Sequence, residues 1–401
     1  MRVTRNPALL CVYQALFGTI FPVAIFPLFW VDDLHMSIST MLSVQAFFGF
    51  VIAVFEFPSG YIADRVGHRF ALVSGSALAL LGWSLYAVAG SLRGVIAAEA
   101  VLGIGFSLIS GADSALLYES LAQTGQEPAF ARWYARARMC GQIAEGSAAL
   151  VAGWLYAYAS RLPFQLEIIV WSFALIVALG LAPVALPAPK IQRHFDQMRF
   201  IARHGLRESK PLRAVVFASV AFGLMSFLPV WLIALYARDA GMQPAWLGPF
   251  WASANYVIAF GSLVSERAGR RLGLGATLWL GVAIAAAGYA GLGLGHGVYA
   301  AFFYYLLTFV RGLHAPLLHH EEQRLVPSSD RAGFLSFRNF LFRGCYVLLG
   351  PWIGAAVERY GQRAVLLGCG ACVVLALIAA TRAIAAQTRA RDELASSPAQ
   401  P

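Results

Sequence analysis

Charged side chains are scarce in this chain. They make up 12% of its 401 residues, whereas an ordinary soluble domain carries about 25%. Hydrophobic residues reach 59%, which is more than a single soluble core can bury. The composition excludes a disordered chain, a small secreted disulfide scaffold and a nucleic-acid-binding module. We therefore expect a polytopic membrane protein with no nucleic-acid partner.

Patterns that would indicate an enzyme or a metal protein are also lacking. The five cysteines all lie in apolar runs, so Cys369 and Cys372 are interpreted as small hydrophobic residues and not as a redox pair. His314, His319 and His320 have no companion cysteines, which argues against a zinc site. No phosphate-binding loop of the Gly-x4-Gly-Lys-Ser/Thr type is present. We expect no enzymatic activity, no catalytic residue, no cofactor and no metal.

Long apolar runs dominate what is present. A bilayer core of about 30 Å needs about 20 apolar residues per helix. The runs are long and continuous, unlike the alternating strands of a β-barrel. The sequence therefore predicts an all-α integral membrane protein with twelve transmembrane helices, at residues 8–30, 40–60, 70–90, 94–117, 137–158, 164–186, 213–236, 246–265, 273–294, 298–318, 335–357 and 363–383.

One long polar stretch, residues 187–212, divides the spans into two groups of six. We expect a first half at 1–186, a cytoplasmic linker at 187–212, a second half at 213–383 and a cytoplasmic tail at 384–401. Loops and termini on one side carry 22 Lys and Arg residues and those on the other side carry 5. By the positive-inside rule, both termini and the linker are expected in the cytoplasm. The expected location is the inner (plasma) membrane of the cell.

Two loops repeat each other. Residues 60–69 read GYIADRVGHR and residues 262–271 read SLVSERAGRR, with the acid, arginine and glycine aligned at an offset of 202. Matching loops on the same side of the membrane indicate a parallel duplication of six helices. The two halves are therefore expected to be pseudo-symmetric, each with a tight, charged turn at this loop.

The loop sequence leads to a family. Residues 55–69, FEFPSGYIADRVGHR, resemble the loop between the second and third helices of the major facilitator superfamily (MFS). The 6+6 topology, the cytoplasmic termini and the basic linker extend the resemblance over nearly the whole chain. The resemblance implies the MFS fold and transport by alternating access. The substrate cavity would lie between the halves, with helices one, four, seven and ten at its centre.

The resemblance to the drug/proton-antiporter-like group of that family is partial. The eleventh span contains the glycine and proline of the antiporter motif in GPWIG, residues 350–354, whereas the fifth span reads GQIAEG at 141–146 and lacks the proline. On the fourth span the family often has an arginine four residues before a glycine. This chain has Glu99 four residues before Gly103 instead.

By the same resemblance, charged residues at the cytoplasmic ends of the helices control the change of conformation. Arg338 is expected to be a partner of Asp64. The expected gating residues of the loop motif and its surroundings are Gly60, Asp64, Arg65, Gly67, Arg69, Asp113, Glu119 and Arg338. The copy of the motif in the second half comprises Glu266, Arg267, Gly269, Arg270 and Arg271.

Ionisable groups within spans are candidates for function, because each costs about 2.5–3.5 kcal/mol to insert. Glu99 could carry a proton, or could be a cavity-rim glutamate that faces water or pairs with an arginine. Glu145 could bind a proton or a cationic substrate, or could bond to a neighbouring helix. Arg311 could line the cavity and bind an anion, or could pair with Glu321 or Glu322 at an inner gate.

Polar and aromatic residues on the spans could contact a substrate, although most membrane aromatics face lipid or anchor the interface. The candidates are Tyr13, Gln14, Trp231, Asn255 and Tyr256.

These features favour a secondary transporter that exports a small molecule by proton-coupled antiport. Arg311 motivates an alternative, uptake of an organic anion by symport or facilitated diffusion. A third interpretation, from a different class, is a non-transporting membrane sensor that kept the fold. The expected partners are a small-molecule substrate, protons or another coupling ion, and the lipid bilayer, and the protein is expected to be a monomer.

Overall fold

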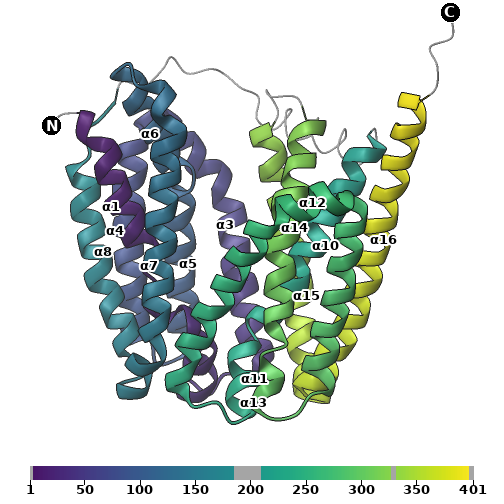
Figure 1. Cartoon of the computed structure of the whole chain (residues 1–401). Helices are drawn as coiled ribbons and strands as arrows, with labels where there is room; N and C mark the ends of the chain where they lie inside the picture. The colour runs from purple at the N-terminus through teal and green to yellow at the C-terminus, as the bar shows by residue number, and fades with distance from the viewer. Residues whose placement is uncertain (1–2, 185–208, 327–330, 397–401) are drawn as a thin grey trace, which may run out of the picture. The chain divides into compact units, whose positions relative to one another are not determined.

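Helices make up nearly all of the protein. The structure, a computed structural model, describes residues 3–184, 209–326 and 331–396, and these residues form helices and no strands (Figure 1). Most of the expected linker, 187–208, and the last part of the expected tail, 397–401, lie outside the described residues. The predicted all-helical membrane fold is confirmed.

Over the described residues, each predicted span lies largely on helix. Ten helical segments of the described chain are long and apolar enough to cross a membrane. One of them, α12 (Pro244–Leu294), contains two predicted spans, which are separated by the non-helical Gly273. The predicted fifth span lies in a further helix, α7 (Phe130–Tyr158).

The chain forms two compact units. Unit 1 comprises Met1–Ile191, Met242–Ala252 and Val347–Gly354, and unit 2 comprises Gln192–Gly241, Ser253–Tyr346 and Ala355–Pro401. Unit 1 thus consists mainly of residues before the expected linker, and unit 2 mainly of residues after it. The domain limits expected from the sequence stay a prediction.

Unit 1 is built on helices that approach each other closely through glycine. α1 packs along α7, and a Cβ atom on Gly18 would lie 2.2 Å from the carbonyl oxygen of Gly141. A contact this close between two backbones leaves no room for a side chain at Gly18, and a Cβ atom on Gly141 would lie 3.0 Å from the carbonyl oxygen of Gln14. The longer helices of this unit are α1 (Asn6–Gly18), α3 (Ile38–Val66), α4 (His68–Val88), α5 (Leu92–Ile109), α6 (Ala112–Gln123), α7 and α8 (Leu162–Gly180).

The first predicted span is interrupted. After α1 ends at Gly18, the chain continues in short helical pieces, η2 (Phe21–Ala24), α2 (Phe26–Leu28) and η3 (Phe29–Asp33). Pro22 and Pro27 have no N–H to donate and clash with a preceding helical turn, so they favour such a break. The interruption leaves backbone N–H groups that need acceptors outside the helix.

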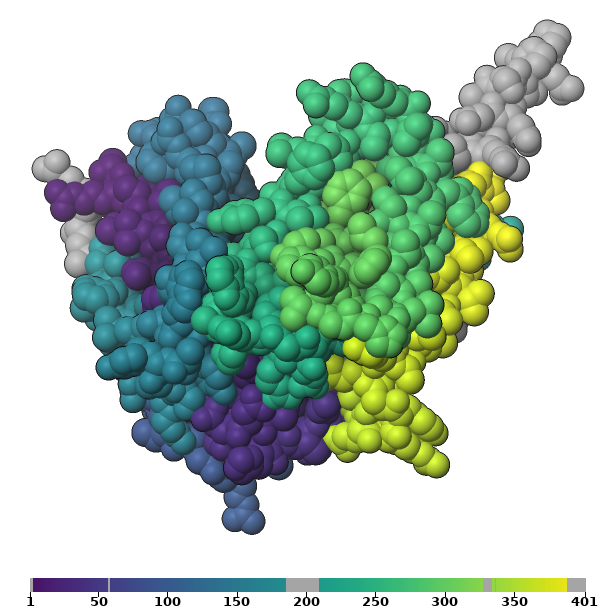
Figure 2. Space-filling model, turned by 60° about the horizontal axis from the view of Figure 1, so that its bottom comes forward, coloured from purple at the N-terminus to yellow at the C-terminus, as the bar shows by residue number. Residues whose placement is uncertain are grey.

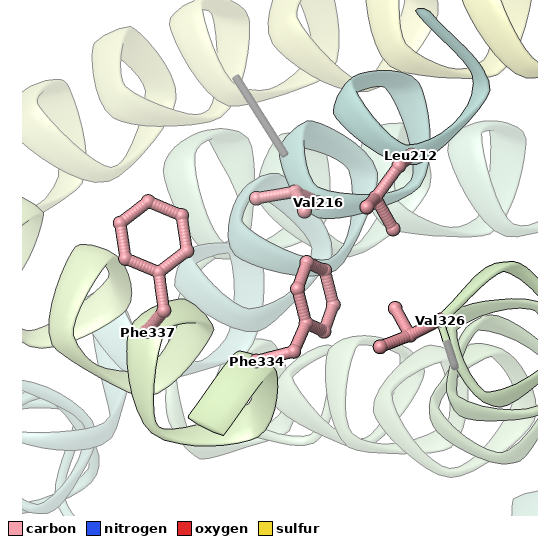
Figure 3. Packing of buried hydrophobic residues seen from close by; sticks show 5 residues of the cluster. All are labelled: Leu212, Val216, Val326, Phe334 and Phe337. Atoms are coloured by element: carbon pink, nitrogen blue, oxygen red, sulfur yellow. The ribbon is translucent and has the colours of Figure 1, made fainter. Parts of the chain in front are cut away.

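Unit 2 contains α10 (Lys210–Val230), α11 (Ile233–Asp239), α13 (Val298–Ala301), α14 (Tyr304–Leu325), α16 (Gln362–Ser396) and the greater parts of α12 and α15 (Arg331–Tyr360). α10 packs against α14 and α16. A buried apolar cluster joins the first turns of α10 to the start of α15 and the end of α14 (Figure 3); its members are Leu212, Val216, Val326, Phe334 and Phe337. α16, drawn in yellow, contributes to the surface of this unit (Figure 2).

The turns of the two repeated loops fall at different places. Gly67 separates α3 from α4 with φ +116°, a conformation that favours glycine. In the second copy Gly269 is helical, and the positive φ, +79°, is found at Gly273. The expected tight turn around Gly269 is therefore wrong. Glu266 and Arg270 pair four residues apart on α12, an interaction that stabilises helix through this point.

Candidate functional site

Glu99 is enclosed inside unit 1. Its side chain on α5 is 3% exposed. The hydroxyl of Tyr86 on α4 donates a hydrogen bond to Oε1, and Nε2 of Gln45 on α3 lies 3.5 Å from the same oxygen. Both partners are neutral, so the alternative of a rim glutamate that faces water or pairs with an arginine does not fit this site.

Tyr86, which binds this carboxyl group, belongs to an aromatic cluster. The ring of Tyr86 stacks on that of Phe164 from α8, with centroids 5.4 Å apart. The ring of Phe26 lies 5.7 Å from that of Tyr86 and 5.6 Å from that of Phe164. Trp30 and Trp83 complete the cluster. Because Glu99 is buried, its low-dielectric surroundings strengthen the electrostatic interactions at the carboxylate.

A second buried carboxyl group, which sequence reasoning missed, lies on α8. Glu167 is fully buried, and its Oε1 accepts a hydrogen bond from the backbone N–H of Phe21 at 2.7 Å. The interruption of the first span supplies this donor. Glu167 lies one turn after Phe164 and therefore next to the same aromatic cluster. Its signal in the sequence was an acid within the apolar run of the sixth span.

Two of the candidate pocket residues lie in the core of unit 1. Tyr13 is fully buried, and its hydroxyl shares a hydrogen bond of 2.9 Å with the Ser76 hydroxyl. Gln14 is also buried, and its Nε2 donates to Oδ2 of Asp113 on α6. Asp113 also interacts electrostatically with Arg138. The resemblance placed Asp113 in the gate; the structure joins it to a residue that we had expected in the pocket.

Glu145 is half-buried on α7. Nε2 of Gln142, one turn earlier on the same helix, lies 3.3 Å from its Oε2. Its role in binding a proton or a cation stays a prediction.

Half of the loop motif is fixed within unit 1. Arg69 donates through Nε to the carbonyl of Leu181 at 2.7 Å and through Nη2 to that of Leu179 at 2.9 Å. It thereby satisfies carbonyl groups at the end of α8, where a positive charge also complements the helix dipole. Nε2 of His68 lies 3.1 Å from Oε1 of Glu119.

The other half of the motif is exposed. Gly60, Asp64 and Arg65 lie on the surface. The guanidinium of Arg65 lies 4.5 Å from the ring centroid of Tyr61, one turn earlier on α3. The expected contact between Asp64 and Arg338 concerns different units and stays a prediction.

A buried amide, which sequence reasoning also missed, joins three parts of unit 1. Asn6 at the start of α1 donates to the Ser120 hydroxyl at 2.8 Å and to the carbonyl of Ala182 at 3.0 Å. Its Oδ1 accepts from the N–H of Ala182 at 2.9 Å. No periodic pattern marks a single asparagine as the centre of such a network.

In unit 2, Arg311 lies exposed on α14, within a membrane span. The two acids considered as its partners are engaged elsewhere. Glu321 pairs with Arg324 at 2.5 Å, and Glu322 pairs with Arg338 at 2.7 Å. The inner-gate pairing of Arg311 is therefore not found, and across the described part of the chain Arg311 has no ion-pair partner. An arginine at membrane depth is stable where water reaches it.

Glu322 is the centre of a buried polar contact between three helices. Its carboxylate is 1% exposed. It accepts from the Ser219 hydroxyl of α10 at 2.7 Å and from Nη1 of Arg338 on α15 at 2.7 Å. Nδ1 of His319 lies 3.6 Å away.

The remaining candidates differ in their exposure. Trp231, directly after α10, and Asn255 on α12 are half-buried, whereas Tyr256 is exposed. Arg267 and Arg271 in the second motif copy are exposed. Over the described ranges, no three His, Cys, Asp or Glu side chains come together in a group that could hold a metal ion.

Comparison with known proteins defines the class. The sequence model of the Major Facilitator Superfamily matches residues 8–344. The fold is similar to that of the nucleoside transporter NupG, with a TM-score of 0.76, 13% identity and coverage of 96% of this chain and 99% of that one. It is also similar to a peptide transporter POT in complex with sulfate, with a TM-score of 0.76, 16% identity and coverage of 96% and 94%. No curated protein matches the chain in sequence.

The chain therefore belongs to the Major Facilitator Superfamily. It is a multi-pass membrane transporter of the MFS type and not an enzyme.

Proposed function

We propose that the protein is a secondary transporter that exports a small molecule in exchange for protons, as in the drug/proton-antiporter-like group of the family. It works as a monomer by alternating access, in the cell inner membrane, with both termini in the cytoplasm. Its substrate is a small, amphipathic compound, and its energy source is the proton gradient.

The observation that supports proton coupling is the environment of Glu99. The carboxyl group is enclosed, and its contacts are a phenol hydroxyl from Tyr86 and a side-chain amide from Gln45. Removal of a carboxylate from water costs free energy, and protonation removes that cost. A conformational change that opens this site to water on one side would release the proton there. Glu167, beside the same rings, is a second group that could hold one.

A specific observation favours a second candidate, the uptake of an organic anion. Arg311 is an exposed cation within a span, and the structure shows no ion pair for it within the described ranges. A guanidinium binds carboxylate or phosphate groups through two parallel hydrogen bonds. A similar structure, a POT family transporter in complex with 5-aminolevulinic acid (TM-score 0.75, 14% identity, 93% of this chain and 95% of that one covered), holds a carboxylate compound.

Flux in proteoliposomes tests both candidates. The purified full chain is reconstituted, a pH gradient is imposed, and movement of a panel of amphipathic cations, neutral compounds and organic anions is measured. Antiport predicts that a member of the panel accumulates on the acidic side of the membrane. Protons move down their gradient in the opposite direction at the same time. The uptake candidate predicts that anions alone are transported and that Arg311→Ala lowers their affinity at least tenfold. Absence of gradient-driven flux and of counterflow for every compound would contradict both.

The role of Glu99 is tested in the same assay. Glu99→Gln keeps the size and an acceptor oxygen, so it is expected to abolish gradient-driven transport and to preserve exchange of labelled for unlabelled substrate. Glu127→Gln, at an exposed carboxyl group outside the spans, is the matched control and is expected to transport normally. Normal pumping by Glu99→Gln would exclude this residue as the proton carrier.

A further inference from the structure

A groove on unit 2 has an apolar wall and a cationic end. It has a volume of about 540 Å³ and lies between α10, α15 and α16. Apolar side chains such as Phe217, Val220 and Leu224 of α10 line its length. Lys210 and Arg213, in the first turn of α10, line one end, and Gln387 of α16 adds an amide. No acidic side chain lies in the described lining.

The groove exists because the two halves of the repeat pack differently. In unit 1, α1 meets α7 backbone to backbone at Gly18 and Gly141. The helices at the corresponding places in unit 2, about 202 residues later, are α10 and α15. Val220 stands 202 residues after Gly18, and a valine cannot allow the same approach.

Large side chains hold α10 and α15 apart instead. Phe227 packs edge-on against Phe342 and Tyr346, with ring centroids 5.1 and 4.8 Å away. At the start of the two helices, Phe334 and Phe337 fill the space beside Val216 (Figure 3). Val216 also lines the groove, so the apolar cluster borders it on one side, and Ala376 and Ala383 of α16 line it on another.

The dimensions match one leaflet of a bilayer. From Arg213 to Leu224 the groove follows eleven residues of α10, or about 16 Å at the helical rise. Half of a hydrocarbon core of about 30 Å is about 15 Å. Phe217 on its wall is 46% exposed, so a chain entering from the bilayer would meet an apolar surface directly.

We propose that this groove binds one anionic phospholipid, with an acyl chain along α10 and the phosphate at Lys210 and Arg213. Basic positions at the end of a membrane helix attract anionic head groups near the membrane surface. The apolar wall suits a hydrocarbon chain, and the two cations at its end attract a negative head group. A soluble anion would make no contact with the apolar wall, and a zwitterionic lipid would gain less from the cations.

The purified full chain, stripped of lipid in detergent, is titrated with phosphatidylglycerol and with phosphatidylcholine. Native mass spectrometry counts the lipids bound, and the melting temperature reports stabilisation. The expected result is one tightly bound phosphatidylglycerol, with at least tenfold weaker binding of phosphatidylcholine. Lys210→Gln/Arg213→Gln is expected to weaken phosphatidylglycerol binding at least tenfold. Arg267→Gln/Arg271→Gln, which removes two exposed charges outside the groove in the same unit, is the matched control and is expected to bind normally.

A second variant tests the apolar wall separately. Ala376→Trp places a large ring in the groove and is expected to abolish binding with both cations present; Ala383→Phe replaces it if the lipid-free melting temperature shows misfolding. Wild-type binding by Lys210→Gln/Arg213→Gln would overturn the proposal, as would equal affinity for the two lipids. Equal loss in the control pair would show general surface attraction and would also overturn it. Unchanged binding by a folded groove-filling variant would place the lipid elsewhere.

Discussion

Arg338 of α15 donates through Nη1 to Oε2 of Glu322 on α14 at 2.7 Å, and this carboxylate is 1% exposed. The Ser219 hydroxyl of α10 donates to the other oxygen. Three helices of unit 2 are thus joined by one buried carboxylate. In an exposed ion pair, water can solvate a charge that loses its partner. The buried carboxylate of Glu322 is not accessible to water in this way.

Loss of one partner of this pair is expected to be costly. Arg338→Gln leaves a buried carboxylate without its cation, and we expect a loss of about 3–5 kcal/mol in the free energy of unfolding. Arg324→Gln, at the more exposed pair with Glu321, is the matched control and should cost less than about 1 kcal/mol. Denaturant unfolding in detergent micelles measures both. Equal destabilisation by the two variants would contradict the buried role of Glu322.

The contact between α1 and α7 is expected to tolerate no side chain. A Cβ atom on Gly18 would meet the carbonyl of Gly141 at 2.2 Å, so Gly18→Ala must separate the two helices. Gly368 on α16 has no atom within 4 Å of an added Cβ, and Gly368→Ala is expected to be neutral or to gain up to about 1 kcal/mol from helix propensity. Yield of folded monomer and melting temperature compare the two. A stable Gly18→Ala variant would show that this crossing adapts.

The two copies of the loop motif should respond differently to alanine. Gly67→Ala and Gly273→Ala each place a side chain at a positive φ, at a cost of about 1–3 kcal/mol. Gly269→Ala is expected to be mild, because its helical Cβ would meet the flexible end of Leu317 at 2.7 Å. Melting temperatures of the three variants test this order. If Gly269→Ala were as destabilising as Gly67→Ala, the turn of the second copy would lie at Gly269, the position that aligns with Gly67.

Glu167 is expected to act first as an acceptor for the N–H of Phe21. Glu167→Gln retains an oxygen at this position and should fold with nearly wild-type stability. Glu167→Leu leaves a buried N–H without an acceptor and should cost about 1–3 kcal/mol. Melting temperatures separate the two variants. If Glu167→Gln folds but also loses gradient-driven flux, Glu167 takes part in proton coupling together with Glu99.

The fold was predictable because long apolar runs and loop charges repeat over the whole chain. The spans at α3, α4 and α16 depend on some twenty residues each, so single exceptions do not hide them. The partners of individual side chains depend on tertiary contacts, and the spacing of residues in the sequence does not show which distant residues meet. Thus Asp113, expected in the gate, is joined to Gln14 of α1, and Arg338 binds Glu322 within its own unit.

The turn around Gly269 was mispredicted for a related reason. Because the two motif copies match in sequence, the same backbone conformation was expected in both. In the second copy, however, the positive φ is found at Gly273, four residues after Gly269. Glu167 was overlooked because an isolated acid in an apolar run has no partner in the sequence; its donor is a backbone N–H released by the break after α1.

The network of Asn6 has a consequence for biosynthesis. Its hydrogen-bond partners, Ser120 and Ala182, are 114 and 176 residues further along the chain. When the first span leaves the ribosome, neither partner has been made, and the amide must keep its own hydration until the sixth span has entered the membrane. The hydrogen bonds of Asn6 can therefore be complete only after α8 and the residues that follow it have been made.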